Sequence, residues 1–136
     1  MARKLNILIV DDSLIMRVNL TRSLQGLGHK IIAEAVDGTT SITAYNEYKP
    51  DLVTMDITMP DMDGITAVKK IKEFDSNANV IMVTSHGQEA MVMDALKAGA
   101  KGYILKPVSP EKLREAIGKI FSELESRNSD ELLDEE

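Results

Sequence analysis

Three aspartates stand where apolar runs end. Residues 5–13 read LNILIVDDS, so an apolar run leads directly into Asp11 and Asp12, and Asp56 ends a second run at residues 52–55. Carboxylates gathered at strand ends repel one another, which favours their protonated forms unless a positive charge lies nearby. Magnesium takes oxygen ligands, usually one or two carboxylates with water and phosphate. The three aspartates therefore predict a Mg²⁺ site that a phosphate group completes.

Two further apolar runs end in groups that suit phosphoryl transfer. Thr84 offers a hydroxyl group and Lys106 offers a second positive charge. A metal ion, an ammonium group and a hydroxyl can together neutralise the oxygens of a phosphoryl group while an aspartate attacks it. Asp56 is the predicted nucleophile because it ends its run alone. Each residue by itself is more often a cap, loop or surface residue, and their joint occurrence indicates one site.

The elements that must position these groups are short strands alternating with helices. Five apolar runs, rich in β-branched residues and without polar alternation, are typical of strands buried on both faces of a parallel sheet. They cover residues 7–10, 31–35, 52–55, 80–84 and 103–105. Parallel α/β sheets carry their functional groups at the carboxyl ends of the strands. The chain is therefore predicted to be an α/β protein with a five-stranded parallel sheet and five helices.

Helical spacing of apolar residues fills the intervals between these runs. The clearest pattern, in residues 113–124, follows Pro110, which fits the first turn of a helix. Ser13, Asp37 and Asp63 are predicted N-caps. Asp61 is interpreted as a turn residue.

Length and composition limit the possible functions. The 136 residues suggest one domain, predicted to span residues 1–125, with an acidic and disordered tail at 126–136. There is no cysteine, which excludes disulfides, thiolate zinc sites and a cysteine nucleophile. No apolar run approaches the ~18 residues of a membrane span. We therefore expect a cytoplasmic protein.

The net charge of −6 argues against a nucleic-acid partner. The last ten residues contribute −4, which leaves −2 for the rest of the chain. A domain without excess positive charge lacks the electrostatic footprint of a DNA or RNA binder. His29 and His86 have no neighbouring metal-ligand residues in the sequence, so a zinc or haem role is not expected for either.

The motifs ILIVDDS, DLVTMDITMPDMDG, VIMVTS and AGAKGYILKP occur in this order. Together they resemble the receiver domains of two-component response regulators, over about residues 5–122. The resemblance is strongest to the stand-alone chemotaxis regulators. It implies a flavodoxin-like, doubly wound fold with strand order 2-1-3-4-5.

The resemblance also implies a ligand set and a phosphorylation site. It makes Asp56 the phosphoacceptor, and Asp12 and Asp56 direct Mg²⁺ ligands. Asp11 would bind the metal mostly through water, and the backbone carbonyl of Thr58 would be a further ligand. Thr84 would contact the phosphoryl group.

Further roles follow from the same resemblance. Lys106 would also contact the phosphoryl group, and the Lys106–Pro107 peptide is expected to be cis. Thr84 and Tyr103 would form a switch in which the hydroxyl moves inward and the aromatic ring follows. Thr58 and His86 would overhang the phosphoryl group and set its lifetime.

The implied function is a phosphorylation-dependent signalling switch in chemotaxis. A histidine kinase or a histidine phosphotransfer domain would be the phosphodonor. The expected target, such as a flagellar motor switch protein, would bind a face made by residues 88–98, the fifth strand and residues 111–121. The chain would catalyse only its own phosphoryl transfer and slow autodephosphorylation, and would not otherwise be an enzyme.

One alternative function stays open, and two others lack residues that they would need. A phosphorelay intermediate or phosphate sink would use the same chemistry. A Mg²⁺-dependent phosphatase would need an acid–base aspartate two residues after Asp56, where this chain has Thr58. A flavodoxin-like cofactor carrier would need a hydroxyl-rich phosphate loop after the first strand and aromatic residues for a flavin, which the carboxylate pair and the absence of Trp disfavour.

Overall fold

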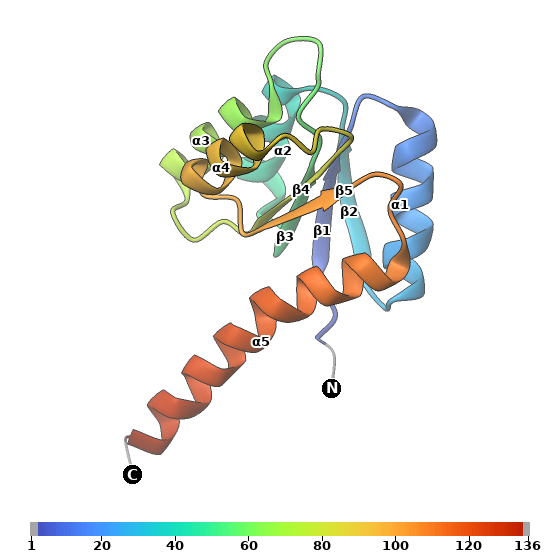
Figure 1. Cartoon of the computed structure of the whole chain (residues 1–136). Helices are drawn as coiled ribbons and strands as arrows, with labels where there is room; N and C mark the ends of the chain where they lie inside the picture. The colour runs from blue at the N-terminus through green and yellow to red at the C-terminus, as the bar shows by residue number, and fades with distance from the viewer. Residues whose placement is uncertain (1–2, 135–136) are drawn as a thin grey trace.

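Strands and helices alternate along the chain. The structure is a computed structural model that describes the backbone of residues 3–134 and the side chains of residues 3–122. Each of five strands is followed by a helix (Figure 1). The strands are β1 (Asn6–Val10), β2 (Lys30–Ala35), β3 (Leu52–Met55), β4 (Val80–Thr84) and β5 (Gly102–Leu105). The helices are α1 (Leu14–Gly26), α2 (Gly38–Tyr48), α3 (Gly64–Phe74), α4 (Glu89–Ala98) and α5 (Pro110–Asp134).

The strands form one parallel sheet in the order β2-β1-β3-β4-β5. The expected flavodoxin-like fold is therefore confirmed. The register pairs Val10 of β1 with Met55 of β3, and the amide of Asp56 donates to the carbonyl of Val10 at 3.0 Å. Asp11 and Asp56 are the residues that directly follow these two strands. The register therefore places them side by side at the carboxyl edge of the sheet.

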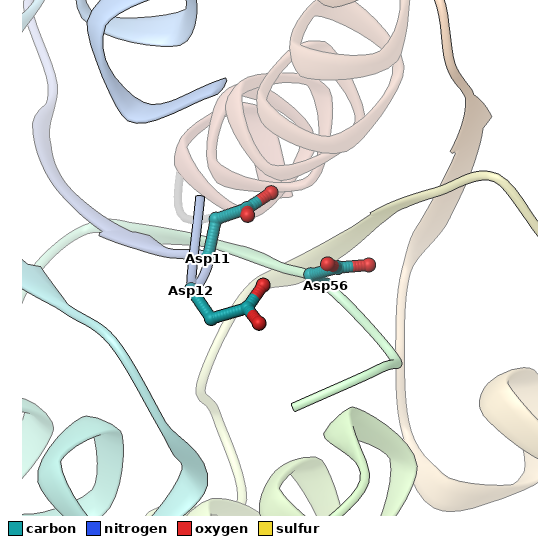
Figure 2. Close-up of side chains that lie close together, drawn as sticks. All are labelled: Asp11, Asp12 and Asp56. Carbon is teal, nitrogen blue, oxygen red and sulfur yellow. The ribbon is translucent and has the colours of Figure 1, made fainter. Parts of the chain in front are cut away.

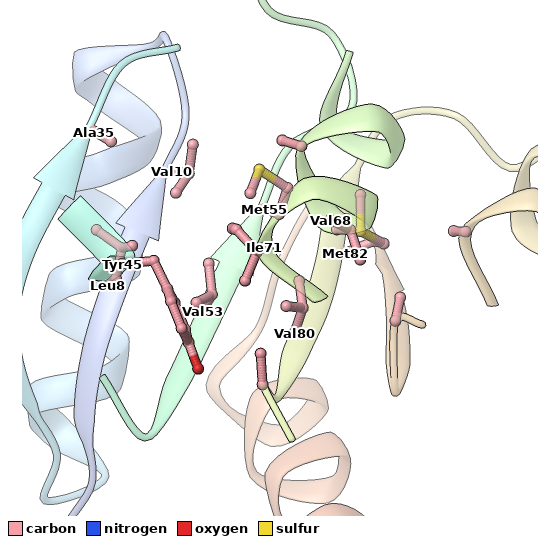
Figure 3. Close-up of a cluster of buried hydrophobic side chains, with 14 of the residues drawn as sticks. Leu8, Val10, Ala35, Tyr45, Val53, Met55, Val68, Ile71, Val80 and Met82 are labelled. Carbon is pink, nitrogen blue, oxygen red and sulfur yellow. The ribbon is translucent and has the colours of Figure 1, made fainter. Parts of the chain in front are cut away.

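Both faces of the sheet are covered, as the apolar runs predict. Successive residues of a strand point to opposite faces, so Leu8 and Val10 contribute to one buried cluster while Ile7 and Ile9 contribute to another. Helices α2, α3 and α4 cover the first cluster, part of which Figure 3 shows. Helices α1 and α5 cover the second. The strands, and with them the groups at their carboxyl ends, are therefore held by packing on both faces of the sheet.

The three predicted N-caps are confirmed. Ser13 Oγ accepts from the amide of Met16 at 3.3 Å, and the carboxylates of Asp37 and Asp63 accept from amides three residues further on at 2.8 and 2.9 Å. A cap of this kind contributes about 1 kcal/mol to helix stability. Ser13 and Asp63 lie within the loops that follow Asp12 and Asp56, so these caps fix the backbone next to the aspartates.

Helix α5 is longer than the sequence analysis predicts. It continues to Asp134 and projects away from the sheet (Figure 1), whereas a disordered tail was predicted from residue 126. Residues 119–134 contain neither Gly nor Pro and many good helix formers, which accounts for a continuous helical backbone. A domain boundary at residue 125 stays a prediction, and residues 135–136 lie outside the described chain. No helix within residues 3–134 has the length and apolar character needed to cross a membrane.

Candidate phosphoryl and metal site

Asp11, Asp12 and Asp56 converge at the carboxyl ends of β1 and β3. Each offers a carboxylate oxygen, and these oxygens all lie within 4.8 Å of one another. Figure 2 shows the first two side chains leaving the end of β1 and the third leaving the end of β3. Asp11 and Asp56 are 1% and 6% exposed, whereas Asp12 is open to solvent. The site is therefore an acidic cluster in which Asp12 is the solvent-exposed member.

Asp11 is held by contacts on both of its carboxylate oxygens. Oδ1 accepts from the amide of Ser13 at 2.9 Å, and Oδ2 accepts from Nζ of Lys106 at 3.0 Å. The lysine contact is an ion pair between two groups that are largely out of water. Asp11 is thus fixed in position before any ligand binds.

Asp56 is buried and partly neutralised. Its Oδ1 accepts from the amide of Ile57 at 2.8 Å, and its Oδ2 lies 3.5 Å from Nζ of Lys106. Burial raises the pKa of the Asp56 carboxyl, the positive charge of Lys106 opposes this rise, and the negative charge of Asp11 adds to it. A second cation beside Asp56 would favour the charged form that a nucleophile requires.

The start of α3 passes close to the backbone of Asp56, and glycine permits this approach. A Cβ atom on Gly64 would lie 2.0 Å from the carbonyl oxygen of Asp56. The amide of Gly64 instead donates to the carbonyl of Ile57 at 2.7 Å. This bond closes the base of the loop of residues 57–63, which contains Thr58.

Lys106 reaches the site from the end of β5. Its amide donates to the carbonyl of Thr84 at 2.8 Å, and the peptide bond to Pro107 is cis. Its ammonium group lies between Asp11 and Asp56 with the side chain only 17% exposed. The structure therefore brings the predicted lysine to two of the predicted aspartates, which lie 95 and 50 residues away from it in the sequence.

His86 joins three other predicted residues. Its amide donates to Oγ1 of the fully buried Thr84 at 3.3 Å, and its Nε2 shares a 2.8 Å hydrogen bond with Oγ1 of Thr58. Its carbonyl accepts from the hydroxyl of Tyr103 at 2.5 Å. The Tyr103 ring packs against the cluster under α4, and partial burial raises its pKa. The loop after β4 is thereby connected to the loop after β3 and to β5.

The donor set fits a hard divalent cation. All three side chains offer carboxylate oxygens, the ligand type that Mg²⁺ prefers. Lys106 offsets part of the charge of Asp11 and Asp56. His29 lies elsewhere, where its Nδ1 accepts from the amide of Leu5 at 3.1 Å, and within residues 3–122 no histidine joins the acidic group.

Two contacts near the site were not anticipated. Arg17 donates from Nη1 to the carbonyl of Asp11 at 2.8 Å and pairs through Nε with Glu34 at 3.2 Å. Arg17 stands three and seven residues before the buried Leu20 and Leu24, a helical spacing that places all three on one side of α1 and that could have indicated this contact. Asp61, interpreted as a turn residue, accepts hydrogen bonds from the first turn of α2. No local pattern indicates this contact, because the partners lie 22 and 23 residues apart.

Comparison with known sequences agrees with the site. Residues 7–118 match the family described as "Response regulator receiver domain". The "Chemotaxis protein CheY" of Bacillus subtilis is 50% identical over 85% of this chain and 97% of its own length. The protein of the same name from Thermotoga maritima is 46% identical over 84% of this chain and 95% of its own.

Solved structures give the same result. The crystal structure of the CheX–CheY–BeF3–Mg²⁺ complex from Borrelia burgdorferi matches with a TM-score of 0.83 and 43% identity. The match covers 85% of this chain and 88% of that one. On the family match, these identities and the shared fold, the chain belongs to the response regulator receiver domain family.

Proposed function

We propose that Asp56 accepts a phosphoryl group from a histidine phosphodonor and that Mg²⁺ is required for this step. The observation that carries the proposal is the meeting of three carboxylates within 4.8 Å, with the Lys106 ammonium 3.0 Å from Asp11 and 3.5 Å from Asp56. The chain is a phosphorylation-dependent signalling switch of the receiver family, and its relatives named CheY support a role in chemotaxis.

Different residues of the chain have different roles in the phosphoryl transfer. A carboxylate oxygen of Asp56 forms the bond to phosphorus as the bond from phosphorus to the donor's imidazole nitrogen breaks. Lys106 and the hydroxyl of Thr84 stabilise the phosphoryl oxygens, whose negative charge no longer faces water. The backbone contacts to Asp11 and Asp56 keep these groups in place, so little reorganisation is needed when the donor arrives.

Asp11, Asp12, Asp56 and the Thr58 carbonyl would hold the metal. When bound, Mg²⁺ supplies positive charge that neutralises both the carboxylates and the incoming phosphoryl oxygens. The chain acts on its own Asp56, and slow loss of the phosphoryl group to water resets it. A histidine kinase or phosphotransfer domain is the proposed donor.

The proposed target surface is the face formed by α4, β5 and α5. A shallow groove on this face is lined by residues that include Tyr103, Leu105, Lys112 and Lys119. Tyr103 contacts His86 and so connects this groove with the loop beside the phosphoryl site. The relatives are named as chemotaxis proteins, which supports a target in chemotaxis. A flagellar motor switch protein is the proposed partner class.

Labelling with a small phosphodonor tests the nucleophile and the metal together. The wild-type chain should take up one hydroxylamine-labile phosphoryl group with Mg²⁺ and none with a chelator. Asp56→Asn should remain folded and unlabelled, because an amide replaces the nucleophilic oxygen. Labelling of Asp56→Asn at the wild-type level, or labelling that persists without divalent metal, would contradict the proposal.

A further inference from the structure

The loop of residues 57–63 is fastened to a helix that carries none of the proposed site residues. Asp61 lies near the tip of this loop. Its Oδ1 accepts from the amide of Gly38 at 2.8 Å, and its Oδ2 accepts from the amide and the hydroxyl of Thr39 at 2.8 and 2.5 Å. Both partners belong to the first turn of α2. Asp61 also accepts from the amide of Met62 within its own loop at 2.8 Å.

The next residue of the loop touches the same turn. A Cβ atom on Gly38 would lie 2.1 Å from Cγ of Met62, so the methionine side chain occupies the space that glycine leaves open. One polar residue and one apolar residue of the loop tip thus contact α2. The base of the loop is closed separately by the hydrogen bond from Gly64 to Ile57.

Helix α2 is capped by two carboxylates from different parts of the chain. Asp37, its own N-cap, accepts from the amide and the hydroxyl of Thr40 at 2.8 and 2.6 Å. Asp61 takes the amides of Gly38 and Thr39. The two carboxylates therefore divide the free N–H groups of the first turn. Of these two carboxylates, Asp61 alone also connects this turn to the loop after β3.

We propose that Asp61 is a positioning residue for the metal site. Asp61 holds the tip of the loop on α2, and the Gly64–Ile57 hydrogen bond closes its base. Together these contacts fix the backbone of Thr58, whose carbonyl is a proposed metal ligand. This inference rests on the proposed function. It assigns to Asp61 a role in metal affinity that acts through the loop, without contact to the metal.

A matched pair of variants distinguishes the loss of the contact between the loop and α2 from the loss of a helix cap. Asp61→Ala and Asp37→Ala each remove a carboxylate cap of α2, and only the first removes hydrogen bonds between α2 and the loop. Asp61→Ala should raise the Mg²⁺ dissociation constant, measured by calorimetric titration, by roughly tenfold, the lower end of what lost supporting contacts cost a metal site. Asp37→Ala should leave it within about twofold, since it removes a cap of the same kind without touching the loop.

Hydrogen exchange in the metal-free protein gives an independent readout. Amides of residues 57–63 should exchange faster in Asp61→Ala than in the wild type, and at the wild-type rate in Asp37→Ala. Asp61→Asn should be intermediate, because its Oδ1 can still accept from Gly38 while its amino group cannot accept from Thr39. Asn and Ala remove the same charge, so a purely electrostatic effect would make these two variants equal and would diminish in high salt.

Unchanged exchange of residues 57–63 in Asp61→Ala would overturn the inference. The inference would also be overturned if Asp61→Ala and Asp37→Ala changed the exchange rates or the Mg²⁺ dissociation constant equally. The same holds if Asp61→Ala bound Mg²⁺ as tightly as the wild type. Failure of the wild type to bind Mg²⁺ would count against the proposed function instead, because the exchange comparison needs no metal.

Discussion

Asp11 and Asp12 are adjacent in the sequence but differ in their surroundings. Asp11 is buried, accepts from the amide of Ser13 and pairs with Lys106 at 3.0 Å. Asp12 is exposed. The first carboxylate therefore supports the fold of the metal-free protein as well as the site, whereas the second is available mainly to a ligand.

This difference predicts separate effects of two conservative substitutions. Asp12→Asn should weaken Mg²⁺ binding and leave the metal-free unfolding free energy within about 0.5 kcal/mol of the wild type, as for other exposed positions. Asp11→Asn should lower the metal-free unfolding free energy by about 1–3 kcal/mol, because Lys106 loses a buried charged partner. Urea denaturation with a chelator measures both. Equal stability losses would show that burial does not distinguish the two aspartates.

The hydrogen bond between His86 and Thr58 predicts an effect on timing. It joins the loop after β3, which begins beside Asp56, to the loop after β4 at 2.8 Å. Its loss should therefore open a path for the water that attacks the phosphoryl group. His86→Ala should shorten the phosphoryl lifetime several-fold, and even a tenfold change needs only ~1.4 kcal/mol.

Thr58→Val is the matched control, since it removes the same bond while keeping the shape of the side chain. Decay of the phosphorylated chain at equal Mg²⁺ is the measurement. A shorter phosphoryl lifetime in both variants would support a role of this hydrogen bond in timing. Decay curves identical to the wild type would leave His86 without such a role.

At the scale of elements, His29 connects the start of β2 to the residue before β1. Its Nδ1 accepts from the amide of Leu5 at 3.1 Å, which requires a neutral ring with the proton on Nε2. The ring is buried, and burial lowers the pKa of His29. In the unfolded chain the ring takes its ordinary pKa of about 6.5. Between that pH and the lower folded pKa, the unfolded state therefore binds more protons than the folded state.

Stability should accordingly fall as the solution is acidified. The contribution of His29 is complete above its unfolded pKa and is lost as the pH falls from about 6.5 toward the lower folded pKa. His29→Asn keeps an acceptor near Leu5 and cannot titrate, so its unfolding free energy should fall less between about pH 7 and pH 5. Urea denaturation at the two pH values measures this. The same loss in wild type and variant would assign the pH dependence to other groups.

Most of the elements could be predicted because their signals are local. Buried strands, helical spacing and the caps at Ser13, Asp37 and Asp63 depend on residues close in the sequence. The convergence of the aspartates followed from one rule, that parallel strands end at the same edge. The contacts of His86 with Thr58 and of Asp61 with α2 span 28 and 22–23 residues. They depend on the paths of two loops, which no periodicity in the sequence describes.

At the scale of the whole molecule, phosphorylation is expected to be sensed on the face of α4, β5 and α5. The hydroxyl of Tyr103 in β5 donates to the carbonyl of His86, and the amide of His86 donates to Thr84. Movement of the Thr84 hydroxyl toward a phosphoryl group should therefore disturb the loop to which Tyr103 is bonded. This is a shift between two packings of the same elements.

Chemical-shift mapping with beryllofluoride and Mg²⁺ checks this expectation. Shift changes should extend beyond the acidic cluster to α4, β5 and residues 110–121. Tyr103→Ala should reduce the changes on that face and retain those near Asp56. Changes confined to the acidic cluster in the wild type would rule out transmission through Tyr103.

The central claim is that phosphoryl transfer occurs at Asp56. Borohydride reduction of the phosphorylated chain converts an aspartyl phosphate to homoserine, and peptide mass spectrometry then locates the modified position. The account predicts homoserine at position 56 alone, formed only when Mg²⁺ was present during phosphorylation. Homoserine at position 11 or 12, or its formation at position 56 without divalent metal, would contradict the account.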